Sequence, residues 1–190
     1  MPLLPKITIK YGKLIDPFFK DSVEKNYPDY IFPSIEEVKK KVELFKEEWN
    51  SNGEKLLTAI FDITGLQFVR SHIDVFVVTA TPRDMSAPFI IRSRYTPEEF
   101  VDMMLHELLH VLFGDNKLRF LKIEGESDRT LNHIEVFAVL TKLYKDTIND
   151  EIRLGKVRDK SYKGNNLEYK RAWELVDKIG YEKIIKELRS

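Results

Sequence analysis

The 190-residue sequence contains no cysteine, and this absence removes three kinds of chemistry at once. The chain can form no disulfide, offers no thiolate to a metal, and has no cysteine nucleophile. Any metal site must therefore be built from histidine and carboxylate side chains.

The chain also lacks an excess of charge of either sign and long apolar runs. Lys plus Arg and Asp plus Glu both number 31, so no net field recruits nucleic acid or an anionic membrane. No segment approaches the roughly 18 uninterrupted apolar residues of a membrane span, and the start MPLLPKITIK lacks the pattern of a signal peptide. We therefore expect no nucleic-acid partner, no membrane association, and a cytoplasmic, intracellular protein.

Glutamine is nearly absent, since Gln67 is the only one, whereas a third of the residues are charged. This composition is typical of the ion-paired surface of a thermophile's protein. The length fits one domain over residues 1–190, and the 43% apolar share is enough to form a core.

The stretch TPEEFVDMMLHELLHVLFG carries the signals of a helix at both ends. Thr96 is a good N-cap, Pro97 suits the first helical position, and Glu99 completes a capping box with Thr96. Gly114 is a plausible C-terminal stop. Apolar residues occupy nearly every side between these ends, so the sequence predicts a buried helix.

Within this helix, His106, Glu107 and His110 match the pattern HExxH. Residues four apart lie one turn apart on the same face, so the two imidazoles can bind one metal ion while Glu107 sits beside them. Buried ionisable groups cost free energy unless they are paired or bind a metal, and three occur here within five residues. The pattern therefore predicts a metal site.

The remaining chain predicts an α+β fold that is mostly helical. We expect an irregular start over residues 1–33 with a short helix near 18–25, and a sheet of about three strands that packs on the HExxH helix. The strands are predicted at 67–70, 73–80 and 89–94. His72, at a strand boundary, is expected to be structural.

Other helices are expected on both sides of this region. A capping box at Ser34 opens one helix, a second follows Asn52-Gly53 and ends at Gly65, and a possible short helix lies in 115–128. Beyond it the apolar pattern predicts a helix at 130–149 and one or two closing helices at 167–188.

The helix predicted at 130–149 offers two candidates for a third metal ligand, His133 and Glu135. They are two residues apart, hence about 200° apart around the helix axis, so only one can face the metal. His133 shares its face with Phe137, Leu140 and Tyr144, an apolar strip suited to packing on the HExxH helix. We therefore expect His133 to be the ligand, with Glu135 as the alternative.

Taken together, HELLH on a buried helix, a small sheet before it and a ligand-bearing helix after it resemble the zincin superfamily of metallopeptidases. The metzincin pattern HExxHxxGxxH does not fit, because Phe113 and Asn116 stand where it has Gly and His. Gluzincins take a downstream glutamate, which would be Glu135. The chain is also similar to small prokaryotic zincin-like proteins in its Asn132-His133-Ile134 string and in a closing segment with Trp173 and Gly180-Tyr181.

This resemblance implies a Zn²⁺ ion held by His106, His110 and His133, with Glu107 as the general base. The implied activity is zinc-dependent hydrolysis of a peptide or protein substrate through a metal-activated water. Tyr144 is a candidate oxyanion donor, and a ligand histidine could be oriented by an acidic residue in the preceding loop: Glu124, Glu126 or Asp128. The alternative function is a non-enzymatic zincin-like binding module that keeps the metal site.

Overall fold

The computed structural model describes residues 3–118, 121–163 and 166–189. These residues form two compact units, which are described in turn. The first comprises Leu3–Lys55 and Phe68–Leu112, and the second comprises Leu56–Gln67 and residues 113–189. The chain is α+β and mostly helical, as the sequence predicts.

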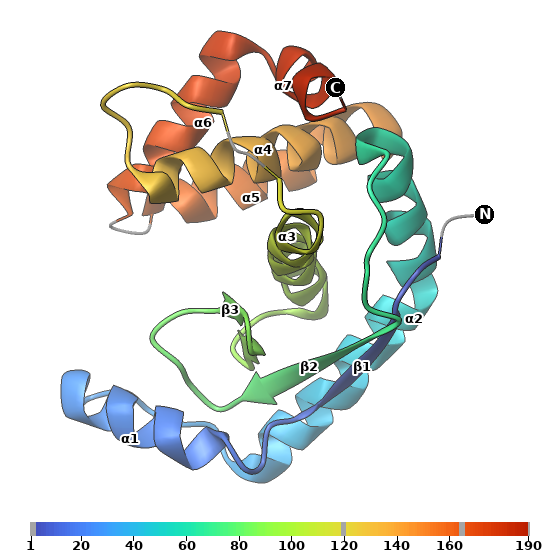
Figure 1. Cartoon of the computed structure of the whole chain (residues 1–190). Coiled ribbons are helices and arrows are strands. Elements are labelled where there is room, and N and C mark those ends of the chain that lie inside the picture. The colour runs from blue at the N-terminus through green and yellow to red at the C-terminus, as the bar shows by residue number, and fades with distance from the viewer. Residues whose placement is uncertain (1–2, 119–120, 164–165, 190) are drawn as a thin grey trace. The chain divides into compact units, whose positions relative to one another are not determined.

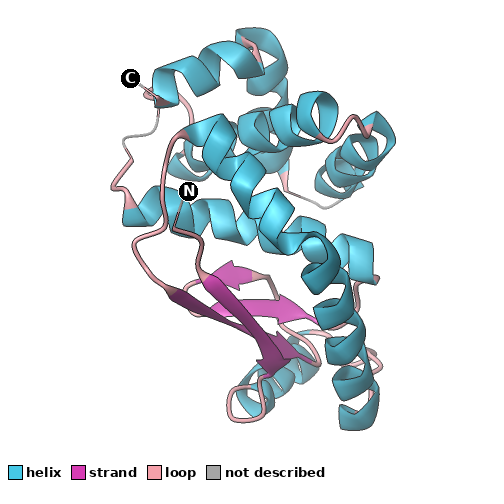
Figure 2. Ribbon diagram, turned by 90° about the vertical axis from the view of Figure 1, so that its right-hand side faces the viewer, coloured by secondary structure: helices cyan, strands magenta, loops and turns pink. Residues whose placement is uncertain are grey.

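The first unit contains a four-stranded mixed sheet with the strand order β1-β2-β4-β3 (Figures 1 and 2). Two parallel pairings join β1 to β2 and β2 to β4, whereas β3 runs antiparallel to β4. The strand bounds are Lys6–Tyr11 for β1, His72–Val78 for β2, Met85–Ser86 for β3 and Phe89–Arg92 for β4. The short β3 is thus an edge strand.

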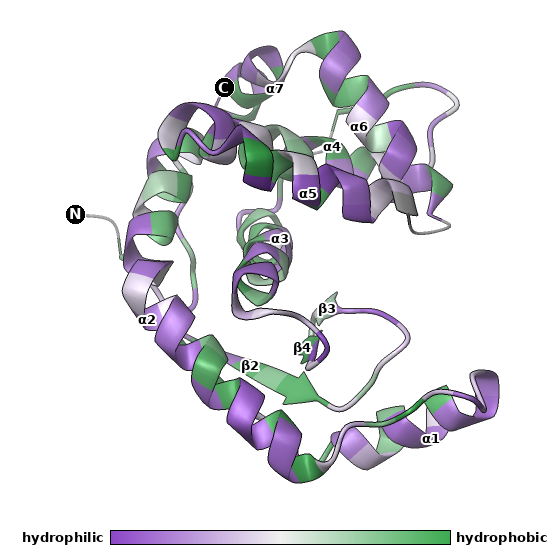
Figure 3. Cartoon of the chain, turned by 180° about the vertical axis from the view of Figure 1, so that it is seen from behind, coloured by the Kyte–Doolittle hydropathy of each residue, from purple (hydrophilic) through white to green (hydrophobic). Residues whose placement is uncertain are grey.

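Two of the expected strands, β2 and β4, are confirmed, and β2 appears apolar in Figure 3. The expectation of an irregular N-terminus is wrong for Lys6–Tyr11, which pairs with β2 from Lys6 opposite His72 onward. The strand expected at 67–70 is also wrong. That segment joins no ladder, and Val69 and Arg70 in it are exposed.

Two helices precede β2 in the sequence, and the second of them belongs to the first unit only as far as Lys55. The expected short helix is α1, Asp16–Asn26, and α2 runs from Ile35 to Thr64. Instead of two helices parted at Asn52-Gly53, the structure has one continuous α2. A Cβ at position 53 would collide with the indole ring of Trp49 one turn earlier, so this glycine permits a close side-chain approach rather than a turn.

The helix that carries the HExxH pattern is α3, Pro97–Asp115, and its residues up to Leu112 belong to the first unit. The ring of Phe100 in α3 stacks on that of Phe45 in α2, with centroids 4.0 Å apart and planes 9° from parallel. The Lys41 ammonium of α2 donates to the Tyr95 carbonyl just before α3. These contacts join the start of α3 to α2.

The second unit is helical. Its elements after α3 are α4 (Asp128–Lys142), the π-helical turn η1 (Leu143–Thr147), α5 (Glu151–Lys163), α6 (Leu167–Ile179) and α7 (Tyr181–Leu188). The expected closing helices are α6 and α7, separated at Gly180, whose φ is +91°, and both pack on α4. The described part of 116–127 holds no helix. Among the described residues, no helix is both long and apolar enough to cross a membrane.

Candidate metal centre

The start of α3 is fixed by the predicted capping box. The Thr96 N–H donates to the Glu99 carboxylate at 2.9 Å, and the Glu99 N–H donates back to the Thr96 hydroxyl at 3.3 Å. The apolar side chains that follow are almost all buried. However, the helix runs one residue past Gly114, so the expected stop at this glycine is wrong by one position.

His106 and His110 face each other on α3, one turn apart. Their Nε2 atoms are 3.2 Å apart and their ring planes are inclined at 71°. Two nitrogens bound to one tetrahedral zinc ion at about 2.0 to 2.1 Å would lie about 3.3 to 3.4 Å apart. The two imidazoles therefore already have the spacing that a shared ion requires.

Burial keeps one of these rings in the state that binds metals. The exclusion of water lowers the pKa of His110 from 6.5 to about 4. The imidazole is therefore neutral at pH 7 and keeps a lone pair for a ligand bond.

Glu107 lies between the two histidines in sequence and is only 6% exposed. Burial is the main cause that raises the pKa of its carboxyl to about 8, and the negative charge of Asp84 adds to it. The positive charges of Arg83 and Arg92 and a hydrogen bond from the Ser86 side chain act in the opposite direction. All four of these residues belong to β3, to β4 or to the segment just before them, so Glu107 is oriented towards this end of the sheet.

The charges near Glu107 are held in place by a compact cluster around Asp84. Its carboxylate accepts hydrogen bonds from the Arg92 backbone N–H at 2.9 Å and from the Tyr95 hydroxyl at 2.6 Å, and it forms an ion pair with the Arg92 guanidinium. The Asp84 side chain is almost fully buried. The cluster ties the segment before β3 to β4 and to the start of α3.

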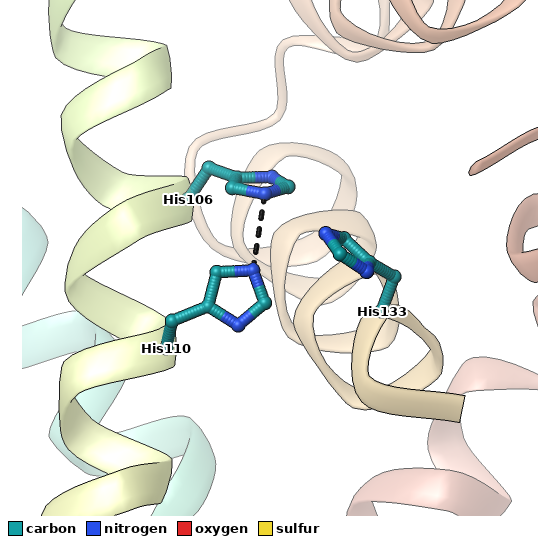
Figure 4. A group of neighbouring side chains, drawn as sticks. All are labelled: His106, His110 and His133. Carbon is teal, nitrogen blue, oxygen red and sulfur yellow. Dashed lines mark hydrogen bonds between the residues drawn. The ribbon is translucent and has the colours of Figure 1, made fainter. Parts of the chain in front are cut away.

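His133 lies in the first half of α4, whose N-cap is Ser127. The His133 Nδ1 atom is 2.7 Å from the carbonyl oxygen of Arg129, one turn earlier. Because a carbonyl only accepts, Nδ1 carries the proton and Nε2 is the nitrogen with the lone pair. One ring nitrogen from each of His106, His110 and His133 lies within 4.8 Å of the others (Figure 4).

Glu135, the alternative ligand, is engaged elsewhere. Its Oε1 atom accepts a hydrogen bond from the Leu121 N–H at 2.9 Å, and burial raises the pKa of its carboxyl above the usual value. Its Oε2 atom is buried without a hydrogen-bond partner among the described residues. The carboxylate thus supports the segment before α4.

The candidate oxyanion donor Tyr144 and the three acidic residues proposed to orient a histidine differ in burial. Tyr144 is fully buried, with the Arg153 guanidinium over its ring, and Glu126 forms an ion pair with Arg171 at 2.7 Å. Glu124 and Asp128 are exposed. The contact seen at the His133 Nδ1 atom is with the backbone carbonyl of Arg129.

Several neighbours of the site escaped the sequence interpretation. Arg92 was expected only as part of a strand and Tyr169 only as part of a closing helix, whereas Asp84 and Ser86 lie between two expected strands. No local pattern marks them, because each approaches Glu107 or His133 from a distant part of the chain. Comparison of the chain with protein-family models, with curated proteins and with solved structures finds no match.

Proposed function

We propose that this protein is a zinc-dependent peptide hydrolase of the zincin type, with His106, His110 and His133 as the metal ligands. The approach of three imidazole nitrogens to within 4.8 Å of one another supports this ligand set. Three protein ligands leave the fourth position of tetrahedral zinc open to water, which is the arrangement of catalytic rather than structural zinc sites. Neutral imidazoles suit Zn²⁺ well, and the chain has no thiolate to offer instead.

The observation that carries the proposal is the position of Glu107. It follows His106 directly, so it points about 100° away from that ligand around the helix axis, and it is buried. When bound, the ion supplies an acidified water and polarises the scissile carbonyl. Glu107 then takes the proton of the attacking water on its carboxylate and delivers it to the leaving amine.

The burial of Glu107 also distinguishes the two functional hypotheses, an enzyme and a non-enzymatic binding module that keeps the metal site. Burying the Glu107 carboxyl costs free energy, and a purely structural site gains nothing from that cost. Buried carboxyl groups with a shifted pKa are common among catalytic acids and bases. The substrate class is a peptide or protein, and the cytoplasmic location expected from the sequence is part of this proposal.

The test compares the zinc-loaded protein with Glu107→Gln on a complex peptide mixture in water enriched in ¹⁸O. Mass spectrometry identifies new termini and counts the ¹⁸O atoms in each new carboxyl group. We expect wild type to generate peptides whose new carboxyl termini carry ¹⁸O from the attacking water. Glu107→Gln should keep the fold and one zinc ion but form no such products, because the amide preserves size and removes the base.

Two results would contradict the proposal. Equal cleavage by wild type and Glu107→Gln would show that this residue is not the base. Stoichiometric zinc without any cleavage by wild type would instead favour the binding module.

A further inference from the structure

Four rings from two helices of the second unit form a continuous aromatic cluster that contains His133. On α4, His133 and Phe137 are four residues apart, and on α6 the same spacing separates Tyr169 from Trp173. Residues four apart lie on one face of a helix, so each helix presents a pair of rings to the other. The contact between α4 and α6 therefore includes His133, a candidate metal ligand.

Tyr169 makes the closest ring contact that His133 has within this cluster. The two ring centroids are 4.1 Å apart with planes inclined at 38°, whereas the centroid of Phe137 is 5.5 Å from that of His133. Phe137 in turn stacks on Trp173 at 4.2 Å with the planes 4° from parallel. Trp173 is fully buried, so this second pair anchors the cluster in the core.

The Tyr169 ring is itself restrained. The Arg129 guanidinium lies over it at 5.2 Å, and the Arg129 Nε atom is 3.5 Å from the Glu168 carboxylate. The carbonyl of the same Arg129 accepts the hydrogen bond from His133. One residue therefore contacts both the edge of the histidine ring and the ring that packs beside it.

We propose that Tyr169 is a positioning residue, whose ring holds the His133 imidazole in the orientation needed to bind the metal. The hydrogen bond at Nδ1 fixes the tautomer, but the orientation of the ring also depends on rotation about the Cβ–Cγ bond of the side chain. Contact with the Tyr169 ring limits this rotation and so directs Nε2. The inference rests on the proposed metal site, and it concerns the aromatic ring of Tyr169 rather than its hydroxyl group.

The experiment is a Co²⁺ titration of the full chain, followed by the visible absorption bands of the bound ion. We expect wild type and Tyr169→Phe to bind within about threefold of each other, since both keep the ring. Tyr169→Leu should bind about 10- to 100-fold more weakly and with altered bands, as is usual when an orienting partner of a metal ligand is lost. Tyr181→Leu removes a ring from α7, away from this cluster, and should match wild type.

The outcomes separate this inference from the metal site itself. If wild type gives no Co²⁺ bands, the proposed metal site is wrong. If wild type binds but Tyr169→Leu binds equally well with the same bands, or Tyr169→Phe loses as much affinity as Tyr169→Leu, ring positioning is wrong. Circular dichroism verifies the fold of each variant, and Tyr169→Met, which fills a similar space without a ring, replaces the leucine variant if that one does not fold.

Discussion

The Nε2 atoms of His106 and His110 lie 3.2 Å apart on one face of α3. This distance is close to the spacing of two ligands of one tetrahedral ion. In this arrangement the two nitrogens share one hydrogen bond. A bound metal ion would instead accept a lone pair from each of them.

Zinc binding should depend on this pair. We expect about one zinc ion per chain for wild type and a large loss in His110→Ala, measured by elemental analysis after dialysis against zinc and then buffer. His72→Ala is the matched control, because His72 is an exposed histidine of the same unit that contacts Thr8. Equal zinc in wild type and His110→Ala would exclude the site, as would a loss in His72→Ala of the same size.

The third ligand can be tested by exchanging the two candidates on α4. His133→Ala should weaken zinc affinity by more than about 100-fold, because losing a ligand costs more than losing its orienting partner. Glu135→Gln should leave the affinity nearly unchanged, since its carboxylate accepts from the Leu121 N–H. Competition titrations with a chromogenic chelator measure both. The opposite ranking would assign the ligand role to Glu135.

Two glycines inside helices, Gly53 in α2 and Gly155 in α5, should respond oppositely to substitution by alanine. Gly53→Ala should destabilise the protein by about 1 to 3 kcal/mol, because the new methyl group collides with the Trp49 ring. Gly155→Ala in α5 meets open space and should stabilise it by about 0.5 to 1 kcal/mol. Urea unfolding provides both free energies. A stabilising Gly53→Ala would mean that the Trp49 ring does not pack there.

The Asp84 cluster predicts a large effect for a small change. Asp84→Asn should lower the free energy of unfolding by about 2 to 4 kcal/mol, because it leaves the largely buried Arg92 guanidinium without a counter-charge. Asp21→Asn, which removes an exposed i,i+4 partner of Lys25 on α1, is the control and should have no measurable effect. If the two variants unfold at the same urea concentration, the cluster does not stabilise this part of the fold.

Local signals in the sequence were sufficient for the helices with strong ends. Thr96 and Glu99 form the predicted capping box, and Gly180 separates the two closing helices. The same signals failed at Asn52-Gly53, where a turn-forming dipeptide lies inside α2. The Trp49 ring occupies the space that a Cβ at position 53 would need, and the local sequence does not reveal this contact.

Strands were harder to predict, because a strand exists only if a partner lies beside it. Lys6–Tyr11 becomes β1 by pairing with β2, more than 60 residues away in the sequence, whereas residues 67–70 have β propensity but no ladder. Propensity alone could not distinguish these two segments.

The sequence by itself determined that His106, Glu107 and His110 would share one buried helix, because helical spacing and capping are local properties. Only the tertiary structure decided which groups contact Glu107 and the two candidate ligands on α4. Asp84 and Ser86 approach Glu107 from another segment, Leu121 engages Glu135, and Tyr169 packs on His133 from another helix. Such contacts depend on how distant segments pack, and their energies are shared among residues that no local pattern connects.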